Sequence, residues 1–131
     1  MSDRVTEASL AELVRRFYAT ARQDPLLGPV FSAAVTDWDA HVAKVAAFWA
    51  QAVLGARGYR GNPLAEHAKH PLTPAMFDRW LAIWGETADT MLAPDDAELV
   101  KMRAGMIAQS LKLGLQGISG LSAPATPRAT G

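Results

Sequence analysis

Through most of this sequence, apolar residues recur at steps of three and four, in stretches that Pro and Gly separate. Such spacing gathers apolar side chains on one face of a helix, whereas the alternation typical of a half-buried β-strand is nearly absent. The same stretches are rich in Ala, Leu, Met, Arg, Lys and Glu, which favour helices. The sequence therefore predicts an all-α chain.

The first helix is predicted from Ser9 to about Gln23. Ser9 and Glu12 have the spacing of a capping box, and the Asp24-Pro25 step ends the helix because a residue before proline avoids the helical region. The expected buried stripe is Leu10, Leu13, Val14, Phe17 and Ala21. The following residues are expected to form a tight connector over 25–35. It should carry inward Leu26, Leu27, Val30 and Phe31.

A second helix is predicted from the N-cap Thr36 to about Leu54. Acidic residues in its first turn support this start, because the N-terminus of a helix carries partial positive charge. These acidic residues are Asp37 and Asp39. Because side chains three and four residues apart share a face, one face of this helix combines an imidazole with apolar groups. Its members are His41, Val45 and Phe48.

Residues 55–62 have the composition of a loop. Pro63 suits the first position of a short helix, because its missing N–H would be unpaired there in any case. This helix is predicted to run to about Lys69 and to carry His67. A short helix between loops can set the angle of an imidazole ring independently of the long helices.

Two further long helices are predicted, each opened by a proline. The third follows Thr73 and ends near Leu92. Its inner face is expected to hold Phe77, Trp80, Leu81 and Trp84. The fourth starts at Pro94 and ends near Gln116. Its inner face is expected to consist of Leu99, Met102, Met106, Ile107, Leu111 and Leu115.

From Gly117 onward, Gly, Ser, Ala, Pro and Thr replace the helix-forming residues. We therefore expect residues 1–117 to form one domain and residues 118–131 to be a disordered tail. A chain of 131 residues fits a single domain that encloses one small-molecule cavity.

Charge and cysteine content exclude several functions. Basic and acidic residues number 13 each and are scattered, so neither nucleic acid nor an anionic membrane is an expected partner. The chain has no cysteine, which excludes disulfides, thiolate metal sites and a Cys nucleophile. No apolar stretch has the length of a membrane span, and the N-terminus lacks the apolar core of a signal peptide. A cytoplasmic protein is expected.

The histidines lie among aromatic and apolar residues, and neutral imidazole is a common ligand of haem iron, zinc and copper. His67 is the candidate ligand, although a solvated histidine near a turn is the simpler explanation. His67 and His70 could also bind a small metal, but a third ligand at zinc-like spacing is not evident. His41 alone is more simply a core histidine bonded to a carbonyl. Tyr18 and Trp80 are, one by one, most simply packing residues.

Four segments carry more information together than any residue does alone. They are Arg16-Phe17-Tyr18 with Asp24 to Phe31, Trp38 to Trp49, Leu54-Gly55 with Tyr59 to His67, and Phe77 to Leu81. In order, spacing and residue type they resemble the group III truncated haemoglobins. The resemblance covers about residues 9–116 and does not depend on any single short motif.

This resemblance implies a truncated globin fold, with helices packed two over two around haem b. It implies His67 as the ligand of iron. On the opposite side of the haem it implies Tyr18, His41 and Trp80, with Val45 packing against a bound diatomic ligand. Further contacts with the cofactor are expected from Phe31, Phe48, Tyr59, His70, Phe77 and Trp80.

One position departs from the family pattern. The residue three places after the iron ligand is usually apolar, and here it is His70. Either His67 or His70 could therefore ligate, and the match at Pro63-Leu64 favours His67. His70, Tyr59 or Arg79 could instead meet a haem propionate.

The resemblance implies a haem-binding globin that binds dioxygen, nitric oxide or carbon monoxide, with oxygen transport as one role. Tyr18, His41 and Trp80 can all donate hydrogen bonds, which would slow release of a partly negative ligand. One alternative is a haem enzyme with peroxidase-like or nitric-oxide dioxygenase activity. It would need an external reductase, because the sequence has no flavin or nicotinamide domain. Another is a cofactor-free helical module whose aromatic stripe binds a partner helix.

Overall fold

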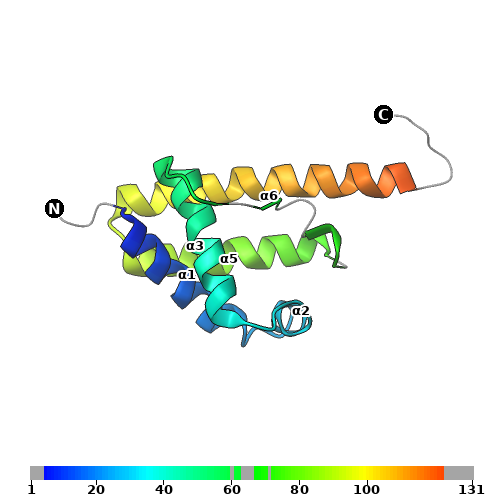
Figure 1. Cartoon of the computed structure of the whole chain (residues 1–131), viewed down its shortest axis with the longest axis horizontal. Coiled ribbons are helices and arrows are strands. Elements are labelled where there is room, and N and C mark those ends of the chain that lie inside the picture. Colours follow the sequence, from blue (N-terminus) through cyan, green and yellow to red (C-terminus); the bar gives the residue numbers. More distant parts are fainter. Residues whose placement is uncertain (1–4, 60, 63–66, 71, 123–131) are drawn as a thin grey trace.

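A computed structural model describes residues 5–59, 61–62, 67–70 and 72–122 of the chain. Within these ranges every regular element is a helix, which confirms the predicted all-α class. In chain order the helices are α1 (Glu7–Ala21), α2 (Gly28–Ala34), α3 (Trp38–Leu54), α5 (Pro74–Met91) and α6 (Pro94–Ser122). α3 packs on α1, and α5 lies alongside α6, so two helix pairs pack on each other (Figure 1).

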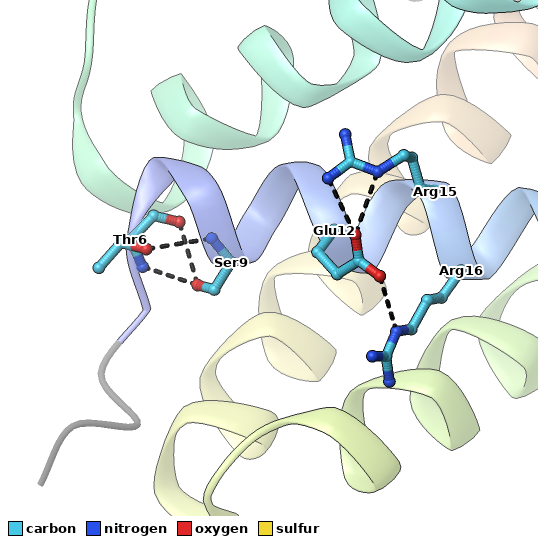
Figure 2. Close-up of polar contacts among 5 residues, drawn as sticks. All are labelled: Thr6, Ser9, Glu12, Arg15 and Arg16. Atoms are coloured by element: carbon cyan, nitrogen blue, oxygen red, sulfur yellow. Dashed lines mark hydrogen bonds and ion pairs between the residues drawn. The ribbon is translucent and has the colours of Figure 1, made fainter.

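α1 begins earlier than predicted. Its N-cap is Thr6, whose side-chain oxygen accepts a hydrogen bond from the backbone N–H of Ser9 at 3.0 Å. The Ser9 hydroxyl in turn accepts one from the N–H of Thr6 at 2.8 Å (Figure 2). Glu12 is not part of the cap and pairs with Arg15 and Arg16, each at 2.9 Å. The earlier start is favoured because Val5, just before the cap, packs against the core.

The predicted buried stripe of α1 is confirmed. Its members, each at most 2% exposed, are Leu10, Leu13, Val14, Phe17 and Ala21. They pack with two tryptophans, Trp49 of α3 and Trp84 of α5, whose rings stack 4.3 Å apart. The indole N–H of Trp84 donates to the carbonyl of Val100 at 3.2 Å. This indole therefore has its acceptor in the core, as a buried donor requires.

The connector predicted between the first two long helices contains a helix, α2. The buried carboxylate of Asp24 accepts hydrogen bonds from the N–H groups of Leu26 and Leu27 at 3.0 and 2.9 Å. Near a helix start such N–H groups have no backbone partner. Gly28 is required because a Cβ there would lie 2.7 Å from the carbonyl oxygen of Arg22. Leu26, which was expected to point inward, is 38% exposed.

α3 has a different N-cap from the one predicted. Asp37, not Thr36, caps the helix, and its carboxylate accepts a hydrogen bond from the N–H of Ala40 at 3.1 Å. Both residue types are good caps, so the local sequence does not separate them. The helix ends at Leu54 as predicted, because Gly55 takes up the left-handed φ of 72° that closes a helix.

α5 begins as predicted, with Thr73 as N-cap and Pro74 as the first residue, and it ends at Met91. The short helix predicted before it lies partly outside the described residues, at positions 63–66. Of its described part, His67 and Ala68 are helical and Lys69 lies in a turn.

The buried face of α6 differs from the predicted one. It consists of Ala97, Val100, Ala104 and Ala108, each at most 1% exposed. Met102 and Met106, which were expected to line the interior, are 53% and 57% exposed. Both sets of residues have helical spacing. The alanine face turns inward because the distance between packed helices depends on the side chains between them, and short side chains let α5 lie close to α6.

α6 also continues to Ser122, beyond its predicted end near Gln116. A glycine inside a helix costs about 1 kcal/mol relative to alanine, which weakens a helix without ending it. Of the predicted tail, residues 123–131 lie outside the described part of the chain. Among the described helices, none is both long and apolar enough to cross a membrane.

Candidate functional site

The helices surround an apolar cavity of about 260 Å³. A smaller cavity of about 110 Å³ adjoins it, and both are lined by Tyr18, His67 and Trp80. Ligand pockets in proteins usually range from about 300 to 1,000 Å³ and are mostly apolar with a few polar groups. The two adjoining cavities together form a site of this kind.

The predicted site residues converge on these cavities from every long helix except α6. The larger cavity is lined by Tyr18, Phe31, His41, Val45, Phe48, Tyr59, His67, His70 and Trp80. Phe77 lines the smaller cavity only. The helical spacing of His41, Val45 and Phe48 does bring them to one wall, as expected from the sequence.

A hydrogen bond joins two of these residues across helices. The Tyr18 hydroxyl lies 2.9 Å from Nε2 of His41, and the two rings meet edge to face. Tyr18 is 7% exposed and belongs to the same buried cluster as the core stripe of α1. The partner of His41 is therefore a hydroxyl, and not the carbonyl that the simpler interpretation of the sequence suggested.

Burial sets the charge of this pair. It raises the pKa of Tyr18 well above its usual range, because the phenolate form would be poorly solvated. Burial also lowers the pKa of His41, and the nearby Lys44 and His67 lower it further. At neutral pH, Tyr18 is therefore a protonated phenol and His41 a neutral imidazole.

Three tryptophans form a stack behind the cavity. The rings of Trp80 and Trp84 are nearly parallel at 6.1 Å, and Trp49 lies 6.4 Å from Trp80. All three line the larger cavity. The N–H of Trp84 donates to the carbonyl of Val100, whereas no acceptor for the Trp80 N–H lies among the described residues. Trp80 therefore keeps a donor for a ligand.

Lys44 is a lining residue that the sequence analysis missed. It lies one turn after His41 and one turn before Phe48, so the helical period already put it on the cavity side of α3. Ile107 and Leu111 close the cavity from α6. These two were expected on the inner face of α6, but not as part of the site.

Arg79, a predicted contact of a cofactor carboxylate, has another role. Its Nε donates to the carboxylate of Asp24 at 2.6 Å, and Arg79 lines neither cavity. Hydrogen bonds from the N–H of Leu27 and from Arg79 hold the pKa of Asp24 below its ordinary value. The geometry therefore does not support the prediction for Arg79, because this side chain pairs with the carboxylate that holds the start of α2.

The small-metal alternative gains no support from the geometry. Among the described residues, no group of three or more His, Asp or Glu side chains is placed to hold a metal ion. His67 and His70 both line the larger cavity, and His67 also reaches the smaller one. A larger cofactor that needs only one imidazole is compatible with this arrangement.

Comparison with known proteins agrees with the geometry. Residues 5–110 match the family model of the bacterial-like globins. The group 3 truncated hemoglobin ctb of Campylobacter jejuni is 34% identical over 109 residues, which are 79% of this chain and 86% of that protein. The crystal structure of group III truncated hemoglobin from Campylobacter jejuni matches with a TM-score of 0.80 and 33% identity, over 86% of this chain and 93% of that one. The chain therefore belongs to the bacterial-like globins and, within them, to the group III truncated haemoglobins.

Proposed function

We propose that this protein binds haem b in the joined cavities and holds dioxygen or a related diatomic ligand there. The observation that carries the proposal is the composition of one cavity. It combines an imidazole, His67, with the hydrogen-bonding side chains Tyr18, His41 and Trp80 among aromatic walls. Membership of the globin family supports the same cofactor.

The residues present fit a haem. A flat apolar macrocycle suits a cavity walled by Phe48, Trp80 and other aromatic side chains. His67 is the better candidate for the iron ligand, because it lines both cavities whereas His70 lines only the larger. Lys44, and His70 where it does not ligate, are suited to the haem carboxylates, since both line the larger cavity.

A bound haem would supply an iron centre to which dioxygen, nitric oxide or carbon monoxide can bind. The chain itself supplies hydrogen-bond donors and excludes water. A hydrogen bond to a charged group contributes about 1.5–3 kcal/mol, which corresponds to roughly 10- to 150-fold in affinity. Two such donors favour slow release of the bound diatomic ligand. Slow release suits chemistry on a held ligand better than transport.

The bond between Tyr18 and His41 controls which group can donate into the cavity. If Nε2 of His41 accepts the phenol proton, the Tyr18 hydroxyl is engaged and cannot donate to a ligand. If Nε2 carries the proton and donates to the Tyr18 oxygen, the hydroxyl proton can point at the ligand. The tautomer of His41 therefore determines whether Tyr18 is a ligand donor.

A second candidate is a haem enzyme with peroxidase-like or nitric-oxide dioxygenase activity and an external reductase. The lowered pKa of His41 favours it, because a neutral imidazole in the cavity can accept or return a proton. Turnover with a chemical reductant, compared between wild type and His41→Gln, would separate catalysis from simple binding. The cofactor-free module is disfavoured, because the aromatic side chains line a cavity and not an exposed stripe.

The proposal is tested by haem uptake. Protein purified from cells supplied with a haem precursor should show a Soret band and contain one haem per chain. Val45→Trp, which fills the cavity, should lose this uptake while far-UV circular dichroism stays helical. Ala43→Trp is the matched control, because Ala43 is exposed on the same helix. A wild-type protein that stays colourless and refuses added haemin would contradict the proposal.

A further inference from the structure

Arg22 and Trp38 form a contact next to two residues of the candidate ligand site, Tyr18 and His41. The Arg22 guanidinium carbon lies 4.1 Å from the centre of the Trp38 ring. Arg22 is the C-cap of α1, and Trp38 is the first residue of α3. The contact therefore ties the end of one helix to the beginning of another, in the region where α1 and α3 meet (Figure 1).

This contact lies one helical turn from the Tyr18–His41 hydrogen bond. Tyr18 and Arg22 are four residues apart on α1, and Trp38 and His41 are three residues apart on α3, so each pair shares a face. α1 and α3 are thus joined at two neighbouring points. The hydrogen bond joins Tyr18 to His41, and the guanidinium over the ring joins Arg22 to Trp38.

Trp38 also contacts both members of the hydrogen-bonded pair. Its ring centre lies 5.2 Å from that of Tyr18 and 5.6 Å from that of His41, in edge-to-face geometry. Trp38 lines neither cavity, so it does not touch a ligand held there. The imidazole of His41 therefore has two aromatic rings packed edge to face against it, those of Tyr18 and Trp38.

We propose that Arg22 and Trp38 act as a brace that holds His41 against Tyr18. Trp38 is the positioning residue, and Arg22 keeps the indole in place by covering one face of its ring. Without the brace, His41 gains a second position away from the cavity, and its hydrogen bond to Tyr18 is partly lost. The consequence for ligand release rests on the proposed function, but the consequence for the hydrogen bond does not.

The size of the effect follows from the exposure of the contact. Arg22 is exposed and Trp38 is half-buried, and a cation–ring contact near the surface corresponds to about two- to fivefold in an equilibrium constant. Loss of Arg22 should therefore raise the fraction of displaced His41 by about two- to fivefold, and the rate of ligand release should change with it, in the direction that the tautomer of His41 sets. Loss of the indole should have the larger effect, because it also removes the contacts with both rings.

The experiment measures the ring nitrogens of His41 by NMR in the full-length protein, with His41→Gln used for assignment. Wild type should show one hydrogen-bonded environment for Nε2. Arg22→Gln and Trp38→Leu should move this signal toward that of an exposed imidazole, and Trp38→Phe should restore most of it. Arg15→Gln is the matched control, since it removes an exposed α1 arginine that pairs with Glu12.

An unchanged His41 signal in both Arg22→Gln and Trp38→Leu would overturn the brace. Arg22→Gln keeps the test valid even if Trp38→Leu fails to fold, because Arg22 is exposed. Rates of dioxygen release from the same variants give the second measurement. A wild-type protein that binds no haem would contradict the proposed function, while the NMR comparison would still decide whether the brace exists.

Discussion

The hydroxyl of Tyr18 and Nε2 of His41, 2.9 Å apart, join α1 to α3 at the wall of the larger cavity. Because the phenol is protonated and the imidazole neutral, a single proton lies between the two atoms. A change in either side chain therefore alters the donor that the other can offer. The ligand chemistry of this globin should respond to this pair before any other part of the cavity.

Tyr18→Phe removes the phenol from that pair. If Tyr18 donates to a bound dioxygen, the variant should release it about 10- to 150-fold faster, because a hydrogen bond to a charged group is lost. Stopped-flow mixing of the oxygenated protein with a ligand trap measures the rate. Tyr59→Phe makes the same chemical change elsewhere in the cavity and should have little effect. Equal rates for wild type and Tyr18→Phe would remove the donor role of Tyr18.

His41 makes stability depend on pH. The pKa of His41 lies below its ordinary value of 6.5 in the folded chain, so the unfolded chain binds a proton at higher pH. The free energy of unfolding should therefore fall as pH decreases from about 6.5 to the folded pKa, and this contribution is constant below it. Urea unfolding between about pH 5 and pH 8 should show a smaller pH slope for His41→Gln than for wild type. The same slope in both proteins would contradict the assignment.

Asp24→Asn should lower the melting temperature by several degrees. The buried carboxylate holds the N–H groups of Leu26 and Leu27 and accepts from Arg79, so an amide would leave part of this network unpaired. Because the pKa of Asp24 is lowered in the folded chain, its stabilising effect is present above its ordinary pKa and lost as pH falls through the folded value. Asp78→Asn, an exposed acid on α5, is the control and should melt like wild type.

The alanine face of α6 should not tolerate larger side chains. Ala104 is fully buried, and Ala104→Leu should destabilise the fold by about 1–3 kcal/mol, because extra methylenes must displace packed neighbours. Met106→Leu changes an exposed side chain on the same helix and should stay within about 0.5 kcal/mol of wild type. Chemical denaturation measures both. A larger loss for Met106→Leu would mean that the methionine face is the packed one.

The all-α class and the four long helices could be predicted from periodicity, but their exact starts and the short helix α2 could not. Ser9 stands three residues before Glu12, and Thr6 stands three residues before Ser9, so either could begin a capped helix. The burial of Val5 decides between them, and burial is a tertiary property. The same holds for α6, where the methionine and alanine faces have equal periodicity and the proximity of α5 selects the alanines.

The site was predictable where helical spacing or family resemblance placed residues together. Helical spacing predicted that His41 and Val45 share a face, and both line the cavity wall. The family resemblance pointed to His67, which lines the same cavity. The same helical spacing also predicts that Lys44 lies on this wall. The ion pair of Arg79 could not be predicted, because its partner Asp24 is 55 residues away in sequence and only the folded chain brings the two together.

The iron ligand is the central claim, and replacement of single histidines tests it most directly. His67→Gly should purify without a Soret band, and added imidazole should restore the band by entering the space the side chain leaves. His70→Gly is the matched control, because His70 also lines the larger cavity, and it should keep its haem. A His67→Gly protein with an unchanged haem spectrum, beside a His70→Gly protein without one, would contradict the account.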